Sequence, residues 1–237
     1  MLIKTPAIVL NAIKYGDTGK IVKFFTLNHG LVSCISKSVY AKKNRTNSLL
    51  FSFNFVELVY DEKPNQSLFF LKEMNASKHF SSIHLQPEKI TIILFLTEIL
   101  NSVLKEEESN RALFEFLENS IFEFDQKKSG YSDFHLWFLL NLTQFLGFYP
   151  HFEKDFLYFD LNNGVSSNEI PTGIYISDSD LQNFEKLFSL EFKSQTESRF
   201  NQIQRKSLLS TLLKYFELHI SDFRQPKSLE VLNQVFQ

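Results

Sequence analysis

The residue types that could perform catalysis occur in this sequence without the spacing that catalysis needs. Gly16-Asp17-Thr18-Gly19-Lys20 is superficially similar to a phosphate-binding loop, but no Gly stands at the required distance before it, and Ile21 replaces the required Ser or Thr. Asp160-Leu161-Asn162-Asn163-Gly164 resembles the opening of a calcium loop, but no suitably placed Glu follows. Both segments are therefore predicted to be turns.

The histidines and the single cysteine give no stronger signal. None of the 6 His residues forms a pair at helical or zinc-finger spacing. Cys34 is the lone cysteine, which excludes an internal disulfide and any zinc site built on two or four cysteines of this chain. It stands between Val32 and Ile35 in a predicted strand, where we expect a small buried hydrophobe. With no carboxylate pair or Ser/His/Asp arrangement, the sequence predicts a binding protein rather than an enzyme, with no cofactor and no metal.

The charged residues are distributed unevenly along the chain. Residues 1–80 carry 11 Lys plus Arg against 5 Asp plus Glu, a balance of +6, whereas residues 81–237 carry 14 against 22, a balance of −8. A basic module joined to an acidic one is typical of nucleic-acid binding by the first part. The alternative is a chance segregation of solvated charges.

Strands must position these cations. Apolar and polar residues alternate with period two over residues 2–71, which is typical of short strands separated by turns. Gly16 to Gly19 and Asn28-His29-Gly30 supply hairpin turns. Five short strands close more readily into a small Greek-key barrel than into an open sheet, so we expect an OB-fold over residues 1–80. The expected strands cover residues 7–13, 21–27, 31–37, 51–56 and 67–74.

After residue 80 the hydrophobic period becomes helical. The predicted fold class is therefore α+β: an N-terminal barrel followed by a mainly α-helical domain over residues 81–237, with an irregular or β insert at about 151–176. Ile90, Leu94 and Ile203 are assigned to buried stripes, and Ser132 or Asp133 to a helix N-cap. The expected helices cover residues 87–104, 113–124, 134–146, 180–188, 200–220 and 227–236, and short strands are expected at 156–161 and 174–176.

The order of these signals along the chain resembles the RecO family of bacterial recombination mediators. Each motif is short, and the shared order over almost the whole chain carries the resemblance. The matching segments are Tyr15-Gly16-Asp17-Thr18, Ile21-Val22, Phe25-Thr26, His29-Gly30-Leu31, Lys37-Ser38-Val39-Tyr40-Ala41-Lys42-Lys43, Leu146-Gly147-Phe148-Tyr149-Pro150 and Lys227-Ser228-Leu229 with Val231-Leu232.

This resemblance implies a function in DNA repair and homologous recombination without a catalytic site. It implies binding of single- and double-stranded DNA, annealing of complementary strands, and help in loading RecA, together with RecR, onto DNA coated by single-strand-binding protein (SSB). Two alternatives stay open from the residues alone: an RNA-binding OB-fold protein and a non-catalytic protein–protein adaptor.

One segment departs from the family pattern. Many members carry a four-cysteine zinc site after the Leu-Gly-Phe-Tyr-Pro segment, but residues 151–176 contain no cysteine. We therefore expect no zinc here. In its place we expect a small apolar cluster of Phe156, Tyr158, Phe159, Leu161, Ile174 and Tyr175.

Candidate binding residues follow from the basic module. Sequence-independent binding of a strand needs cations along the phosphates and flat side chains for stacking. Tyr40 is the expected stacking residue, and Lys23 and Lys37 have an alternative interpretation as ordinary solvent-facing strand residues. The predicted DNA-binding residues are Lys14, Lys20, Lys23, Lys37, Tyr40, Lys42, Lys43 and Arg45.

A second site, for the acidic C-terminal tail of SSB, is implied by the resemblance and belongs on the helical domain. Such a tail needs an apolar groove flanked by cations. The candidates are Arg111, Arg199, Arg205 and Lys206, each of which has the alternative of being a plain surface charge. Since no apolar run approaches the ~20 residues that span a bilayer, we expect no membrane contact and a cytoplasmic, nucleoid-associated protein.

Overall fold

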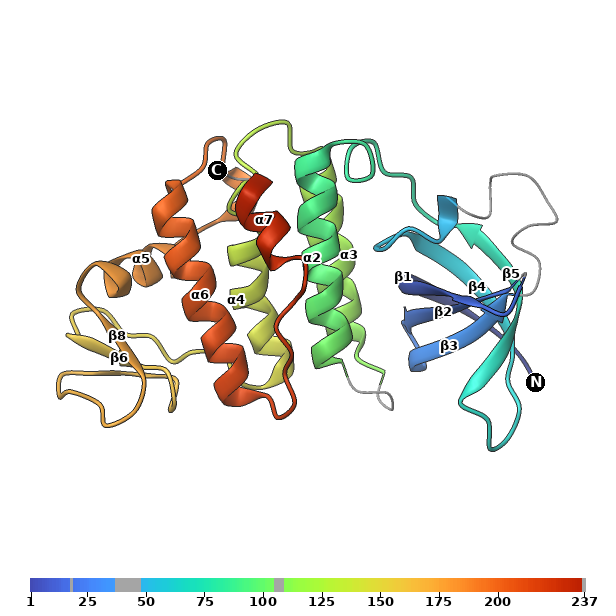
Figure 1. Ribbon diagram of the computed structural model, residues 1–237, viewed down its shortest axis with the longest axis horizontal. Helices are drawn as coiled ribbons and strands as arrows, with labels where there is room; N and C mark the ends of the chain where they lie inside the picture. Colours follow the sequence, from blue (N-terminus) through green and yellow to red (C-terminus); the bar gives the residue numbers. More distant parts are fainter. Residues whose placement is uncertain (18, 37–47, 105–108, 236–237) are drawn as a thin grey trace. The chain divides into compact units, whose positions relative to one another are not determined.

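A computed structural model describes residues 1–17, 19–36, 48–104 and 109–235 (Figure 1). The chain divides into two compact units, Met1–Asp125 and Gln126–Gln237. Within the described ranges, the first unit contains a β-barrel followed by long helices, and the second contains further helices and a small sheet.

Five strands of the first unit form a closed barrel in the order β1-β2-β3-β5-β4. The pair β3 and β5 is parallel, and the other neighbouring pairs are antiparallel. This OB-like barrel followed by a helical region confirms the predicted fold class. The strands are β1 (Leu2–Tyr15), β2 (Gly19–Thr26), β3 (Gly30–Ser36), β4 (Phe55–Asp61) and β5 (Leu68–Ala76).

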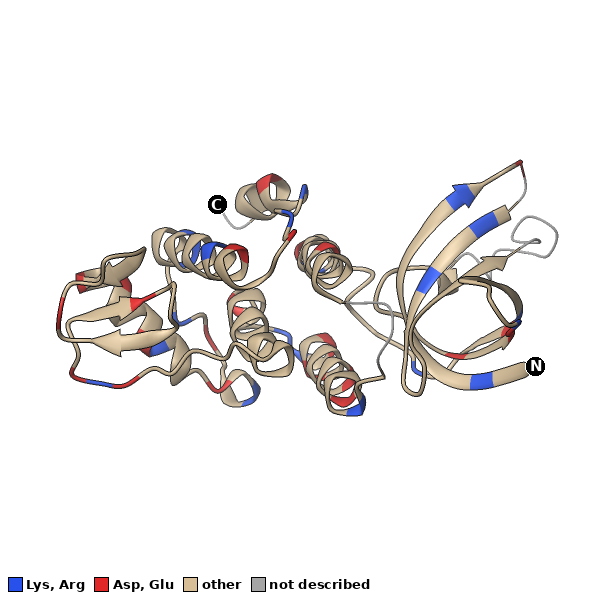
Figure 2. Cartoon of the chain, turned by 90° about the horizontal axis from the view of Figure 1, so that it is seen from below, with Lys and Arg blue, Asp and Glu red and all other residues tan. Residues whose placement is uncertain are grey.

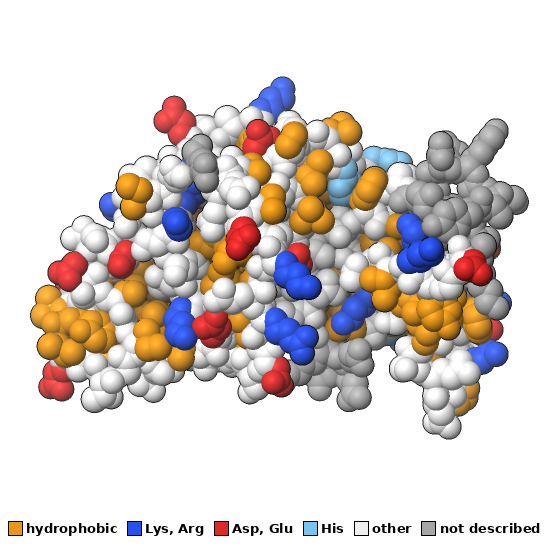
Figure 3. All heavy atoms as spheres, in the orientation of Figure 1, with side chains coloured by type: hydrophobic (Ala, Val, Ile, Leu, Met, Phe, Trp, Pro, Cys, Tyr) orange, Lys and Arg blue, Asp and Glu red, His pale blue; other side chains and the backbone are white. Residues whose placement is uncertain are grey.

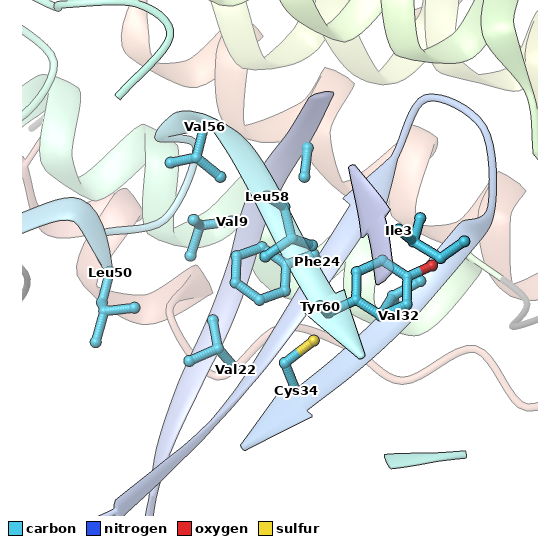
Figure 4. Packing of buried hydrophobic residues seen from close by; sticks show 11 residues of the cluster. Ile3, Val9, Val22, Phe24, Val32, Cys34, Leu50, Val56, Leu58 and Tyr60 are labelled. Atoms are coloured by element: carbon cyan, nitrogen blue, oxygen red, sulfur yellow. The ribbon is translucent and has the colours of Figure 1, made fainter. Parts of the chain in front are cut away.

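The barrel interior is filled by alternate side chains of these strands, as the period-two pattern predicts (Figure 4). Cys34 is fully buried there, and burial raises the pKa of its thiol to about 12. The prediction of Cys34 as a small buried hydrophobe is therefore confirmed. The buried cluster contains Ile3, Ala7, Val9, Val22, Phe24, Val32, Cys34, Leu50, Val56, Leu58 and Tyr60.

The glycines of the barrel hairpins lie where the sequence places them. Gly16 has φ +60° between paired residues Tyr15 and Gly19, and Gly30 has φ +60° directly opposite Thr26. A residue with positive φ suits Gly because Gly lacks a Cβ atom. The segment that is superficially similar to a phosphate loop is thus a hairpin connection.

The predicted fourth strand, residues 51–56, is wrong, because β4 begins only at Phe55. Phe53 has φ +61°, a left-handed conformation that interrupts the alternation, and its N–H donates to the Val9 carbonyl at 2.7 Å. The N–H of Asn54 closes a turn on the Phe51 carbonyl at 3.1 Å. Phe51 is consequently 56% exposed, while Phe53 and Phe55 are buried.

The long helices α2 (Pro87–Val103) and α3 (Arg111–Gln126) follow the barrel in the described part of the first unit. The assigned stripe of α2 is partly wrong, since Leu94 is 49% exposed and Ile90 is only half-buried. Most of the α2 surface is buried, so its apolar residues do not mark one narrow stripe. The residues at the centre of that buried surface are Ile92, Phe95, Leu96 and Ile99.

A buried network ties the segment before α2 to the end of α3. Lys89 Nζ donates to Ser82 Oγ at 2.7 Å and to the Phe124 carbonyl at 2.8 Å. The Asp125 carboxylate accepts from the backbone N–H groups of Ser81 at 2.9 Å and Ser82 at 2.7 Å. Burial lowers the pKa of Lys89 to about 8. Burial alone would raise the pKa of Asp125, but the donors pointing at it outweigh burial and lower it.

The second unit contains helices and a three-stranded antiparallel sheet of order β7-β6-β8, which packs against α5. The predicted strands near 156–161 and 174–176 are confirmed, while β7 was not predicted. The assignment of Ile203 to a buried stripe is wrong, because this side chain is 81% exposed in the first turn of α6. The elements are α4 (Phe134–Leu146), β6 (Tyr158–Asp160), β7 (Val165–Ser167), β8 (Tyr175–Ser177), α5 (Asp178–Phe188), η1 (Phe192–Ser194), α6 (Gln202–His219) and α7 (Leu229–Val235).

The apolar cluster predicted within residues 151–176 forms with a different membership. Phe159 is buried, but Ile174 and Tyr175 are 41% and 39% exposed. The reason is that β6 directs Phe159 toward α5, where its ring lies 5.1 Å from that of Phe184. Phe152 and Phe188 join it, with ring centroids 4.8 Å apart. Within the described ranges, no three His, Cys, Asp or Glu side chains come together as a metal site would require.

Candidate nucleic-acid interface and partner site

The β1–β2 hairpin concentrates three of the predicted DNA-binding cations: Lys14, Lys20 and Lys23, here called the hairpin lysines. Lys14 and Lys20 are direct cross-strand partners, and Lys23 lies opposite Asn11 on β1 and Ser33 on β3. In Figure 2, positions of Lys and Arg lie side by side on neighbouring barrel strands. The register therefore brings the backbone positions of two lysines together at the turn end of this hairpin.

The alternation of the strands divides the hairpin lysines between two surfaces. Lys14 and Lys20 continue the inward-facing positions of Ala12 and Val22 beyond the barrel core, whereas Lys23 lies on the outer face. Lys14 is exposed, and Lys20 and Lys23 are half-buried. Both surfaces of one hairpin therefore present positive charge.

The other predicted DNA-binding residues follow β3 directly, and they are Lys37, Tyr40, Lys42, Lys43 and Arg45. They lie outside the described residues, which resume at Ser48. Their role stays a prediction from the sequence.

In the second unit, two of the four predicted partner-binding cations line one hollow of about 90 Å³, here called the Arg205 hollow. Arg205 and Lys206 stand on α6, and Leu209 and Leu232 supply apolar surface from α6 and α7. The hollow thus combines cations with apolar side chains, which is what an acidic tail with a hydrophobic end requires. Its lining consists of His135, Gln202, Arg205, Lys206, Leu209, Leu232 and Asn233.

Asp133 fixes Arg205 at the edge of the hollow. Arg205 Nη1 lies 3.4 Å from Asp133 Oδ1, and it also donates to the Phe200 carbonyl. The Asp133 carboxylate, fully buried, also accepts from the Arg199 backbone N–H at 2.6 Å and from Gln195 Nε2 at 2.9 Å. Asp133 is the N-cap residue of α4, as predicted. The expected capping hydrogen bond is absent, because the Asp133 side chain does not accept from a backbone N–H at the start of α4.

Arg205 keeps unused hydrogen-bonding capacity. Within the described part of the chain, its buried Nε has no hydrogen-bond acceptor. A buried donor on a charged group is costly to leave unpaired, so a ligand carboxylate in the hollow would relieve that cost. The neighbouring His135 is uncharged near neutral pH, since burial and, second, the Arg205 charge lower its pKa to about 3.

The structure does not bring the other two candidate cations to this hollow. The Arg199 guanidinium donates to the Lys186 carbonyl at 3.1 Å and to Ser189 Oγ at 3.0 Å. Arg111 belongs to the first unit and forms an exposed ion pair with Glu115 on the same helix at 3.4 Å. Leu209 and Leu232 were not predicted as site residues. Leu209 could have been found from the sequence, because it lies one helical turn after Arg205 and therefore on the same side of α6.

The fold defines a class of protein in which a small OB-like barrel precedes a helical region. Comparison with known families narrows this class. The family model described as Recombination protein O N terminal matches residues 1–80, and the one described as Recombination protein O C terminal matches residues 84–230.

Curated relatives match this chain over its full length and point to the same family. A DNA repair protein RecO of Christiangramia forsetii is 37% identical over 239 residues, covering 100% of both chains. Proteins of the same name from Bacteroides fragilis and Flavobacterium psychrophilum are 35% and 34% identical over 241 residues, again covering 100% of both chains. The chain belongs to the RecO family of DNA repair proteins. Among the helices that the structure describes, none is long and apolar enough to cross a membrane.

Proposed function

We propose that this chain is a non-catalytic mediator of DNA repair and homologous recombination. It binds single- and double-stranded DNA through its barrel, anneals complementary strands, and helps RecR to load RecA onto strands coated by SSB. Its place of action is the cytoplasm, at the nucleoid. The observation that carries the proposal is the direct opposition of Lys14 and Lys20 on the barrel hairpin of a chain whose relatives are named DNA repair proteins.

Phosphate binding explains why the lysines face each other. Each phosphate that a cation neutralises releases condensed counterions, so affinity falls with salt in proportion to the number of contacts. Sequence-independent binding of this kind suits annealing, because complementary strands of any sequence must be held. The basic residues that follow β3 in the sequence are proposed to add further phosphate contacts.

The Arg205 hollow is the proposed site for the SSB tail. Lys206 and the unused donor of Arg205 would hold the acidic residues and terminal carboxylate, and Leu209 and Leu232 would contact the apolar side chains of the tail. Placing DNA and SSB sites on different units would let the chain hold a coated strand by both components.

The salt dependence of DNA binding tests the proposal. We expect the variant Lys14→Ala/Lys20→Ala/Lys23→Ala to bind single- and double-stranded oligonucleotides more weakly, with the slope of log K against log salt reduced by about one unit per lost contact. Lys42→Ala/Lys43→Ala/Arg45→Ala is expected to do the same. Fluorescence anisotropy over a salt series measures both.

Lys4→Ala is the matched control, because Lys4 stands on β1 but pairs with Glu57 at 3.0 Å. Its salt slope should equal that of the wild-type chain. Unchanged slopes in both triple variants would contradict the assignment of these cations to DNA. Tighter binding of RNA than of DNA of the same sequence would instead favour an RNA-binding protein.

A further inference from the structure

The Arg205 hollow is smaller than the ligand that is proposed to fill it. Its volume is about 90 Å³, and a water molecule takes up about 30 Å³ in the liquid, so the hollow has room for only a few waters. A carboxylate group fits into that space, but an acidic tail with apolar side chains does not. Arg205 Nε, the donor without an acceptor among the described residues, is itself buried. Part of the lining must therefore move before a tail can bind.

Helices α4, α6 and α7 all contribute to the lining, and the first two are firmly held. Asp133, at the start of α4, lies 3.4 Å from the Arg205 guanidinium on α6. Ser207 Oγ of α6 donates to Asp180 Oδ1 of α5 at 2.6 Å. The buried side chains of α6 are Leu208, Leu209, Leu212, Leu213, Tyr215 and Phe216. The lining from α4 and α6 is therefore fixed by packing and by polar contacts.

Helix α7 is held much more weakly. Leu232 is the one buried residue among the seven described residues of this helix, and Val231 is 50% exposed. Within residues 229–235, which the structure describes in full, no side chain forms a hydrogen bond or an ion pair with another helix. On the face that carries α6 and α7, Figure 3 shows hydrophobic side chains at the surface. A helix this short is not stable in water alone, so its position depends on Leu232.

The chain before α7 supplies a fixed point about which this helix can turn. Pro226 is buried, and the Phe223 ring lies 5.6 Å from the Phe216 ring of α6. Figure 1 shows the chain turning after α6 and running back in the opposite direction to α7, which begins at Leu229. The chain is thus anchored as far as Pro226, and the connection between Pro226 and Leu229 can act as a hinge.

We propose that α7 is a flap on the Arg205 hollow, which turns about this hinge and opens to admit the acidic tail of SSB. The inference rests on the proposed function, because the tail is the proposed ligand of the hollow. Segments with few buried contacts are the ones that open locally in folded proteins. As α7 opens, Leu232 leaves space for an apolar side chain of the tail, and a carboxylate of the tail reaches Arg205.

A closed flap reduces apparent affinity and the rate of association, because only the open fraction of the chains binds. The strength with which Leu232 holds α7 therefore sets how readily the tail binds. A plain contact between Leu232 and the tail would have a different effect, since losing it would change mainly the rate of dissociation.

Association kinetics of a tail peptide test the flap in the full chain carrying Leu232→Ala. The probe is a fluorescein-labelled peptide with the sequence of the cognate SSB tail, and stopped-flow anisotropy gives its association and dissociation rate constants. A smaller side chain holds α7 less firmly, so we expect the association rate constant to rise at least about fivefold. Leu232→Val, which removes less apolar surface, should raise it by a smaller factor.

Val231→Ala is the matched control, because Val231 is an exposed residue of the same helix and stands outside the lining of the hollow. Its rate constants should equal those of the wild type. Hydrogen exchange of the α4 and α6 amides establishes that each variant is folded. If the wild type binds the peptide but neither Leu232 variant associates faster, the flap is overturned and the proposed site stays intact. A wild-type chain that does not bind the peptide would overturn the proposed site, and the flap with it.

Discussion

At the scale of single residues, the second unit depends on charged groups buried beside one another. Asp133 is fully buried, and its carboxylate accepts from four residues: Gln195, Arg199, Phe200 and Arg205. His135, two residues further on, is buried next to Arg205 and must stay neutral. A buried histidine that folds only as the neutral form makes stability depend on pH.

We expect the second unit to lose stability as the pH falls below 6.5, the ordinary pKa of histidine. The pKa of His135 is lowered to about 3 in the folded chain, so between these values the unfolded chain binds a proton that the folded chain does not. The free energy of unfolding should fall by about 1.4 kcal/mol per pH unit in that range. Trp137, the single tryptophan of the chain, reports unfolding of this unit by fluorescence.

His135→Gln should lose this part of the pH dependence, whereas His151→Gln, at an exposed position, should keep it. A His135→Gln chain with the same slope as the wild type would show that another group causes the effect.

At the scale of elements, two positions require glycine for different reasons. At the first the reason is backbone conformation alone, and at the second there is also no space for a side chain. Gly147 ends α4 with φ +84°, and a Cβ added there would meet nothing within 4 Å. Gly164, in the turn between β6 and β7, has φ +68°, and an added Cβ would lie 2.5 Å from the Tyr215 hydroxyl. That hydroxyl donates to the Phe148 carbonyl at 3.0 Å, so it is not free to move away.

We therefore expect Gly147→Ala to destabilise the second unit by about 1 kcal/mol, the usual difference between Gly and Ala in this conformation. Gly164→Ala should cost about 2 kcal/mol more, because overpacking adds to the strain. Urea denaturation followed by Trp137 fluorescence measures both. An equal decrease in the free energy of unfolding for the two variants would mean that the Tyr215 side chain can move away without destabilising the fold.

Most elements could be predicted from the sequence because their signals are local. The hairpin turns at Gly16 and Gly30 and the end of α4 at Gly147 depend on backbone conformations that Gly favours. The start of β4 could not be predicted, because residues 51–56 alternate like a strand. The left-handed conformation of Phe53 accompanies a tertiary hydrogen bond to Val9, which the local sequence does not reveal. Ile203 was wrongly assigned to a buried stripe, because the helical period does not show which turn of a helix lies outside the contact with its neighbours.

The candidate sites were predictable only in part, because composition is visible in the sequence whereas strand register and helix packing are not. Charge asymmetry identifies the basic barrel, but the opposition of Lys14 to Lys20 depends on strand register. Likewise, Arg205 and Lys206 reach a common hollow with Leu232 only through the packing of α7 in the second unit.

At the scale of the whole molecule, the two units have separate proposed tasks. The barrel unit carries the cations proposed to hold DNA, and the helical unit carries the Arg205 hollow proposed to hold the SSB tail. A chain with both sites can bind a coated strand and bring its complement to it. Neither task requires a nucleotide or a catalytic residue.

Annealing of complementary oligonucleotides coated with the cognate SSB is the sharpest test of the proposed function. We expect the chain to accelerate annealing of coated strands, and Lys14→Ala/Lys20→Ala/Lys23→Ala to slow annealing of both coated and bare strands. Lys206→Glu, or an SSB lacking its acidic tail, should slow only the reaction of coated strands, while the exposed control Lys227→Glu should behave as the wild type. Annealing at the same rate with and without the wild-type chain would contradict the account.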